Sequence, residues 1–275
     1  MSKKSISQIL SDIINDNQIE TSDMLFDIAL PKSKYYSVES YEVKSDEKSK
    51  ELSRPIGKYI LLTLQDNNYK SKKLISIYTN AIVGALSNVL PQINNNDTIL
   101  VVGLGNEKID SDSLGHNVCS MVIVTRLIGD MGGLPKTATI APSVMGDTGI
   151  ETCDIVCGIV EKIKPKCIII VDSLCATSYK RLGCSIQITN AGLTPGEGVQ
   201  SPKKPLNKST LNCDVITIGV PLMIYAKAFC NHNTDIDDTL VVTFHDIDYV
   251  VKDIARIIAK SINKAVLGID NTELL

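Results

Sequence analysis

Two aspartates stand where this sequence could do chemistry. Asp112 lies in Thr98–Gly115, TILVVGLGNEKIDSDSLG, soon after an apolar run, and Asp172 ends the apolar run of Cys167–Ser173, CIIIVDS. In a doubly wound α/β sheet, ligands bind in the crevice beyond the carboxyl ends of the parallel strands. Two carboxyl groups that meet there cannot both ionise cheaply, so one keeps its proton and acts as an acid while the other acts as a base on water. This pairing suits amide hydrolysis without a metal or a nucleophilic side chain.

Each aspartate also has a purely structural interpretation. Asp112, with Asp110 competing for the same place, could cap the helix that Leu114 begins, a contribution of about 0.5–2 kcal/mol. Asp172 could cap the turn that follows its strand. However, the five residues before Asp172 are apolar or cysteine, and burying a carboxylate there is costly unless it is paired or hydrogen-bonded. The sequence therefore favours a functional role for Asp172 if Asp112 lies beside it.

A third loop adds two candidates. Residues 140–152, IAPSVMGDTGIET, form a glycine-rich loop that opens a helix and contains Gly146 and Glu151. An acid at the start of a helix is also favoured by the helix dipole, so Glu151 has a structural interpretation as well.

Several other chemistries lack part of their pattern. Gly103-Leu-Gly-Asn106 resembles the start of a dinucleotide fingerprint, but Lys108 stands where the third glycine is needed. The glycines then indicate a tight turn at the end of a strand. A serine triad would need His116, His232 or His245, and no G-x-S-x-G nucleophile elbow is present.

A metal or cofactor is not expected either. Cys153 and Cys157 are four residues apart on one predicted helix, which could begin a metal site, but the chain has no C-x-x-C pair and three histidines. The eight cysteines stand mostly in apolar runs, which is typical of buried thiols in a reducing compartment.

The elements that position these residues follow from the apolar pattern. Continuous apolar runs such as ILVV, CIIIV and VITI indicate strands that are covered on both faces. The sequence predicts an α/β fold, a mostly parallel doubly wound sheet with helices on both faces, plus a small strand-rich N-terminal extension at residues 35–66. The expected strands are residues 98–104, 137–141, 166–172, 185–189 and 214–220, the last stopped by Pro221, and the expected helices are 72–90, 114–129, 149–164 and 246–265.

Composition limits the class of protein. The 275 residues are 44% hydrophobic and carry a formal net charge of -3, enough for one large domain and unlike a general nucleic-acid binder. No apolar run is long enough for a membrane span, and Asp12 and Asp16 interrupt the N-terminus too soon for a secretory signal. We therefore expect a cytoplasmic protein.

Five motifs together resemble the germination protease family of spore-forming bacteria. They are GLGN…DSLG (103–115), IAPSVMGDTGIET (140–152), VDSLCATS (171–178), IQITNAGLTPGEGV (186–199) and VITIGVP (215–221). The resemblance implies an atypical aspartic-type endopeptidase that degrades small acid-soluble spore proteins during germination, in the spore core or forespore. It places the essential aspartates at Asp112 and Asp172. Substrate binding or support of the aspartates would fall to Asn106, Gly146, Glu151 and Gly196.

The same resemblance implies a self-processing zymogen and a homo-oligomer, a tetramer in the family. Family cleavage sites have an acidic residue, an apolar residue and alanine, which Asp27-Ile28-Ala29 matches. Residues 1–27 would then be a propeptide cut after Asp27, and 28–275 a single protease domain with its core at 97–275.

The chain departs from the family at His116, where the family has proline, and at Asn190, where it has an acid. It also lacks a long segment before the last helix. Two alternatives stay open. The hydrogenase maturation proteases share a G-[LI]-G-N-x-x-x-x-D-x-x-G pattern and bind nickel, and a non-proteolytic spore protein could use the same fold as a binding module.

Overall fold

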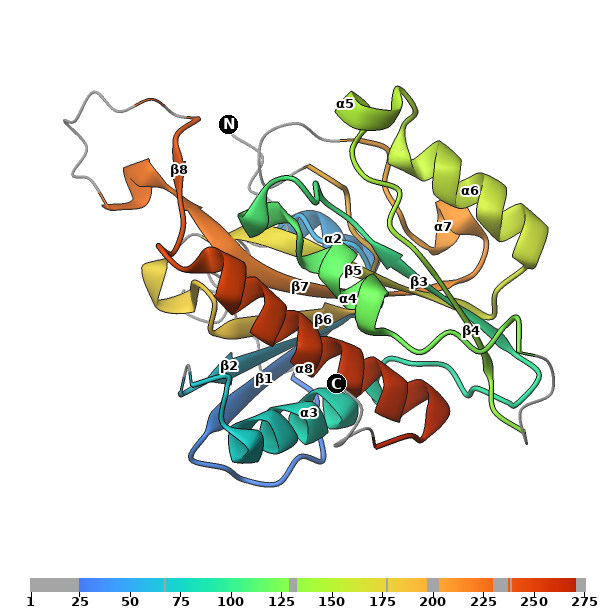
Figure 1. Cartoon of the computed structure of the whole chain (residues 1–275), viewed down its shortest axis with the longest axis horizontal. Helices are drawn as coiled ribbons and strands as arrows, with labels where there is room; N and C mark the ends of the chain where they lie inside the picture. Colours follow the sequence, from blue (N-terminus) through green and yellow to red (C-terminus); the bar gives the residue numbers. More distant parts are fainter. Residues whose placement is uncertain are drawn as a thin grey trace.

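The computed structural model describes residues 25–66, 68–128, 133–176, 178–196, 203–229, 237 and 239–270. Within them, eight strands form one mixed sheet with helices on both faces (Figure 1). The strand order is β1-β2-β6-β7-β5-β3-β4, and β8 pairs with β7. The strands are β1 Tyr36–Val43, β2 Gly57–Leu64, β3 Thr98–Gly103, β4 Lys136–Ile140, β5 Cys167–Ala176, β6 Ser185–Thr189, β7 Asp214–Tyr225 and β8 Val241–Val242.

The parallel core predicted from the apolar runs is confirmed. Strands β3, β4, β5 and β7 pair in parallel, and each β3 and β5 residue from Ile99 to Val102 and from Cys167 to Val171 is at most 1% exposed. Strand β6 joins β7 in the antiparallel sense, and the β1–β2 hairpin then joins β6. The strand-rich segment at residues 35–66 is thus part of the same sheet.

Helices cover the sheet in two layers. A large apolar cluster lies between the sheet and α3 (Lys72–Leu86), α4 (Leu114–Met121) and α8 (Ile247–Leu267), and a smaller one lies under α6 (Thr152–Ile163) and α7 (Lys208–Leu211). Figure 1 shows α8, α4 and α3 on the near side of the sheet. The apolar stripe expected over residues 72–90 is buried, although α3 ends at Leu86.

Three sequence predictions need correction. The helix expected over residues 114–129 ends at Met121, because Val122 turns to extended backbone and a run of β-branched residues follows. Strand β7 runs through Pro221 to Tyr225, and the register between β7 and β5 shifts beside Leu174, so the missing proline amide falls at an irregularity in the ladder. The segment 35–66, predicted to be strand-rich, also contains α2 (Asp46–Leu52), capped by the Ser45 side chain.

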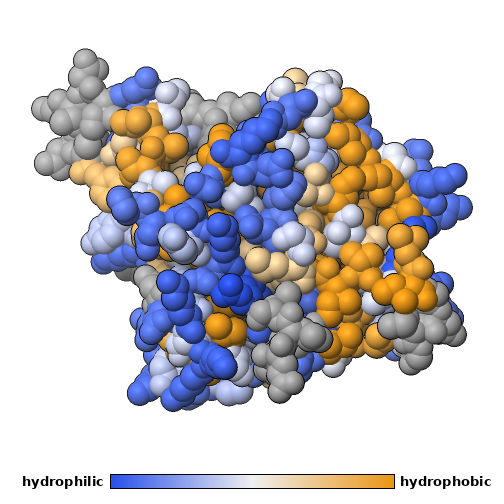
Figure 2. Space-filling model, viewed as in Figure 1, coloured by the Kyte–Doolittle hydropathy of each residue, from blue (hydrophilic) through white to orange (hydrophobic). Residues whose placement is uncertain are grey.

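One face of the molecule carries exposed hydrophobic residues. Figure 2 shows them on the right-hand side of the view, where β4 and the segment that follows α4 lie in Figure 1. Val124, Leu127 and Ile128 of that segment are 38%, 85% and 58% exposed. None of the helices in the described ranges has both the length and the apolar character to span a membrane.

Glycines let the loop after β3 pack against the start of α4. A Cβ atom on Gly115 would lie 2.4 Å from the Leu104 backbone nitrogen, and one on Gly103 would lie 2.1 Å from the Gly115 carbonyl oxygen. Backbone lies on both sides of this contact, so a side chain has nowhere to move. The two glycines are therefore required by a close approach of two chain segments.

We expect Gly115→Ala to lower the free energy of unfolding by several kcal/mol, because the added methyl group must separate the two segments. Gly158→Ala on α6 is the matched control. A Cβ there meets no atom within 4 Å, so alanine should be neutral or stabilising by up to about 1 kcal/mol. Urea denaturation of both variants measures the difference, and equal stability would contradict the close-approach argument.

Candidate active site

The two predicted aspartates meet where β3 ends and β5 continues. The last bond between these strands runs from the Leu104 amide to the Val171 carbonyl, 2.9 Å. The chain then leaves the sheet, and Asp112 ends a short 3-10 helix, Asp110–Asp112. Asp172 lies inside β5, not at its end as predicted, because β5 runs on to Ala176.

Loop geometry fixes the position of Asp112. Gly105 has φ +100°, and a Cβ atom there would lie 1.9 Å from the Asp112 carbonyl oxygen. The Asn106 amide donates a 2.8 Å hydrogen bond to Asp112 Oδ2. The predicted residue Asn106 thus supports the aspartate through its backbone, while its side-chain oxygen accepts a 3.0 Å bond from the Lys108 amide.

The surroundings raise the pKa of both carboxyl groups. Burial raises the pKa of Asp172 to about 8, the nearby charge of Asp112 adds to the rise, and a backbone hydrogen bond from Ser173 opposes it. Burial also raises the pKa of Asp112 to about 6, opposed by the Asn106 amide. The Asp112 charge disfavours ionisation of Asp172, so Asp112 loses its proton at a lower pH than Asp172.

Ion pairs connect the loops around the aspartates. Lys108 Nζ lies 2.8 Å from Asp147 Oδ1 and so joins the loop after β3 to α5 (Met145–Thr148), while the Ser143 hydroxyl donates to Asp147 Oδ2 at 2.9 Å. His116 Nε2 lies 2.7 Å from Glu107 Oε2. Sequence reasoning missed both pairs, because nothing in the spacing of Lys108 and Asp147 indicates that they meet.

The other predicted residues lie outside the aspartate pair. Gly146 is exposed on α5, and a Cβ atom there would meet nothing within 4 Å. Glu151 accepts a 2.7 Å bond from the Lys204 amide and lies 3.3 Å from Lys204 Nζ, so it holds the loop after β6 against α6. Lys204 also lies 2.8 Å from Asp154 Oδ1 on α6. Gly196 takes φ +73° in a turn, a conformation that favours glycine.

The predicted processing site lies across the sheet from the aspartates. Leu25 bridges to Tyr41 on the outer side of β1, and β1 is four strands from β5. At about 4.8 Å per strand this is a separation of about 19 Å. Asp27 is exposed, whereas Ile28 packs against the larger apolar cluster, on the face opposite the cluster that contains Ile170.

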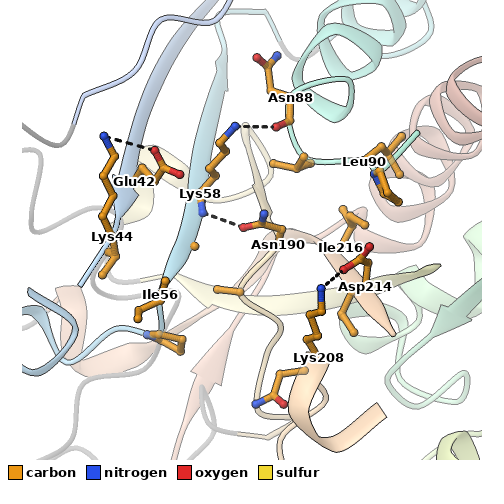
Figure 3. Close-up of a pocket in the computed structure, with 18 of the residues that line it drawn as sticks. Glu42, Lys44, Ile56, Lys58, Asn88, Leu90, Asn190, Lys208, Asp214 and Ile216 are labelled. Atoms are coloured by element: carbon orange, nitrogen blue, oxygen red, sulfur yellow. Dashed lines mark hydrogen bonds and ion pairs between the residues drawn. The ribbon is translucent and has the colours of Figure 1, made fainter. Parts of the chain in front are cut away.

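A separate pocket lies at the opposite end of the strands. Its volume is about 760 Å³, and it is lined by the first residues of β2 and β7 and by the chain after α3 (Figure 3). Lys44 pairs with Glu42 at 3.7 Å, and Lys208 pairs with Asp214 at 2.7 Å. Asp214 is in register with Cys167, five residues before Asp172, so the pocket is distinct from the aspartate site.

Asn190 lines this pocket. Its side-chain oxygen accepts a 2.8 Å bond from the Lys58 amide, as Figure 3 shows. The departure from the family at this position therefore lies at the β2–β6 junction and away from the aspartates. The described residues contain no group of three or more histidine, cysteine or acidic side chains placed to hold a metal ion.

The fold and the two carboxyl groups define the class first: an α/β protein with two aspartates of raised pKa toward the carboxyl ends of its parallel strands. A sequence profile described as Germination protease matches residues 9–236. The chain belongs to the germination protease family.

Curated relatives with this name are similar over most of the chain. The germination protease of Clostridium perfringens (strain SM101) is 31% identical over 207 residues, 72% of this chain and 63% of that protein. That of Geobacillus sp. (strain WCH70) is 33% identical over 222 residues, 77% of this chain and 56% of that protein. The chain therefore spans less than two thirds of the length of these relatives. A solved structure, the [NiFe] hydrogenase maturation protease HycI from Thermococcus kodakarensis, superposes with a TM-score of 0.38 at 18% identity, covering 65% of this chain and 99% of that one.

We expect Asp172→Asn to change how stability depends on pH. The folded-state pKa of about 8 exceeds the unfolded value near 3.9, so folding favours the protonated carboxyl group. Wild-type stability should fall as the pH rises from about 4 to 8, whereas the neutral amide avoids this loss, about 1.4 kcal/mol for each pKa unit at most. The variant should match the wild type near pH 4 and melt at a higher temperature at pH 8.

Thermal melts of both proteins from pH 4 to 9 measure the difference in melting temperature. Asp110→Asn, at an exposed position in the loop that carries Asp112, is the control and should melt with the same pH dependence as the wild type. A difference between Asp172→Asn and the wild type that is constant with pH would contradict the burial argument.

Proposed function

We propose that this chain is an aspartic-type endopeptidase that hydrolyses small acid-soluble spore proteins during germination. The observation that carries the proposal is the coupled pair Asp112 and Asp172, with pKa values raised to about 6 and about 8 in a chain that belongs to the germination protease family. At neutral pH such a pair holds one proton, which is the state that metal-free hydrolysis needs.

The pKa order assigns the roles. Asp172 keeps the proton and acts as the general acid, while ionised Asp112 accepts a proton from water. The hydroxide oxygen forms a bond to the carbonyl carbon of the scissile peptide, and the Asp172 proton moves to the carbonyl oxygen. When the tetrahedral intermediate collapses, the C–N bond breaks and the leaving nitrogen takes up the proton that Asp112 accepted. One hydroxyl of the intermediate becomes the new carbonyl and returns its proton to Asp172, which restores the starting state of the pair. The Asn106 amide holds Asp112 Oδ2 in place throughout, at 2.8 Å.

The family resemblance supports the remaining parts of the proposal. The protein would act in the cytoplasm of the spore core or forespore and would assemble as a homo-oligomer, with the tetramer of the family as the expected form. It would be made as a zymogen and cut between Asp27 and Ile28. No cofactor enters the proposed reaction.

We expect the wild-type chain to cut a small acid-soluble spore protein after an acidic residue, with Asp112→Asn and Asp172→Asn each lowering kcat/KM by at least about 10³-fold. The rate should be highest between about pH 6 and 8, because Asp112 is protonated below this range and Asp172 is ionised above it. Fragment masses and a pH–rate profile measure both effects.

Two results would redirect the proposal. Stimulation by nickel or loss of activity in a chelator would favour the mechanism of the hydrogenase maturation proteases. Binding of the spore protein without cleavage at any pH would favour a binding module.

Processing is expected to occur between molecules. Leu25, two residues before Asp27, bridges to β1, which is about 19 Å across the sheet from β5, so a chain in this conformation does not present the Asp27–Ile28 bond to its own aspartates. Wild-type protein should therefore cut a tagged full-length Asp172→Asn chain between Asp27 and Ile28, at a rate that rises with enzyme concentration. Intact masses follow both chains. Self-processing of wild type with no cut in the tagged chain would contradict intermolecular cleavage.

A further inference from the structure

The outer edge of β4 has an alternating hydrogen-bond pattern. The Lys136 amide donates to the Asp97 carbonyl at 2.9 Å, so Lys136 directs its backbone groups toward β3. Because successive residues of a strand point their backbone groups to opposite sides, Thr137 and Thr139 direct theirs away from the sheet. Strand β4 is the last in the strand order, so these outward groups lie on an edge.

The chain itself covers the first of these outward positions. The Thr137 carbonyl accepts bonds from the amides of Thr125 and Arg126, at 3.2 and 3.0 Å, and the Thr137 amide donates to Thr125 Oγ1 at 2.9 Å. Neither the Thr139 amide nor its carbonyl has a hydrogen-bond partner on that side among the described residues. The protein therefore closes the half of the edge that is remote from the aspartates and leaves the nearer half open.

The open position lies in the half of β4 that is nearer the carboxyl ends of the parallel strands. Thr139 is in register with Val101 on β3, and β3 lies between β4 and β5. Two strand spacings, about 10 Å, therefore separate β4 from the strand that carries Asp172. Beyond β4 the chain enters the loop to α5, which the Lys108–Asp147 ion pair joins to the loop that carries Asp112. A chain added outside β4 would run in the direction of this loop, three strand spacings, about 14 Å, from β5.

Exposed apolar residues precede and follow β4 in the chain. Leu127 and Ile128 follow the segment that covers Thr137, while Met145 at the start of α5 and Ile150 after it are 48% and 52% exposed. The hydrophobic area in Figure 2 lies on this side of the molecule. An extended peptide with apolar residues at alternate positions would match an edge with apolar contacts on both sides of an open backbone position.

We propose that the β4 edge at Thr139 binds the polypeptide substrate as an added β-strand and directs it to the aspartate pair. The proposal rests on the proposed peptidase function. A peptide strand suits this edge better than a second copy of the chain. One outward position of the strand is open, whereas a stable protein interface buries about 1,200–2,000 Å². The main-chain bonds would supply affinity independent of sequence, which suits a protease that cuts several related proteins.

A binding experiment tests the edge without requiring turnover. The probe is a fluorescent peptide with the sequence of residues 20–35 of this chain, bound to full-length Asp172→Asn protein and followed by anisotropy. Adding Thr139→Pro removes the outward amide and leaves the bonds to β3 in place, so the Kd should rise at least about 10-fold. Thr139→Val keeps the backbone and is the matched control, with an unchanged Kd.

Backbone N-methylation of the peptide keeps the proposal falsifiable if the proline variant is unstable. Two peptides are compared, each methylated on one of the two alternating sets of backbone amides. Methylation of the set that faces β4 should weaken binding about 10-fold, and methylation of the other set should not, because an added strand bonds through alternate residues. Equal weakening of binding by both methylated peptides would overturn the edge-binding proposal. A folded Thr139→Pro variant that binds the peptide as tightly as Thr139→Val would overturn it too. Cleavage of the peptide by wild type in that case would leave the peptidase function standing. If the peptide binds normally and with the alternating pattern but wild type does not cleave it, the proposed peptidase function is wrong and the edge-binding proposal stands.

Discussion

The structure depends most on one close contact, in which the loop after β3 packs backbone to backbone against the start of α4. Gly103, Gly105 and Gly115 make this possible, since a Cβ atom at any of them would overlap backbone atoms. The contact brings Asp112 back over the end of β3 and beside Asp172. Without it Asp112 would lie in a solvated loop away from Asp172, which remains in β5 and would lose the added effect of the Asp112 charge.

Burial and hydrogen bonding separate the pKa values of the two aspartates. Asp172 lies in β5 beside the buried strand β7, so its charged form loses hydration, and a Ser173 backbone hydrogen bond replaces only part of it. Asp112 is held by the Asn106 amide and its pKa rises less. A difference in hydrogen bonding and burial between two identical side chains is enough to assign one as acid and one as base.

The two edges of the sheet differ in how the chain covers them. Beyond β1 lies the extended segment with Asp27 and Ile28, held away from the aspartates by Leu25 and by apolar packing. Beyond β4 lies an edge that the chain covers only in part. An open sheet edge can pair with other protein chains and cause aggregation. An opening limited to one position, Thr139, therefore fits transient binding of a peptide better than a permanent interface.

The sequence alone determined the parallel core, because apolar strands buried on both faces have a pattern that few other elements share. It also located both aspartates, since each follows an apolar run that positions it at the same end of the sheet. Tertiary structure decided what depends on distant contacts. Strand β5 continues past Asp172 because β7 remains beside it, although β3 has left. The Lys108–Asp147 pair, the open edge at Thr139 and the position of Asp27 depend on strand order, which local pattern does not encode.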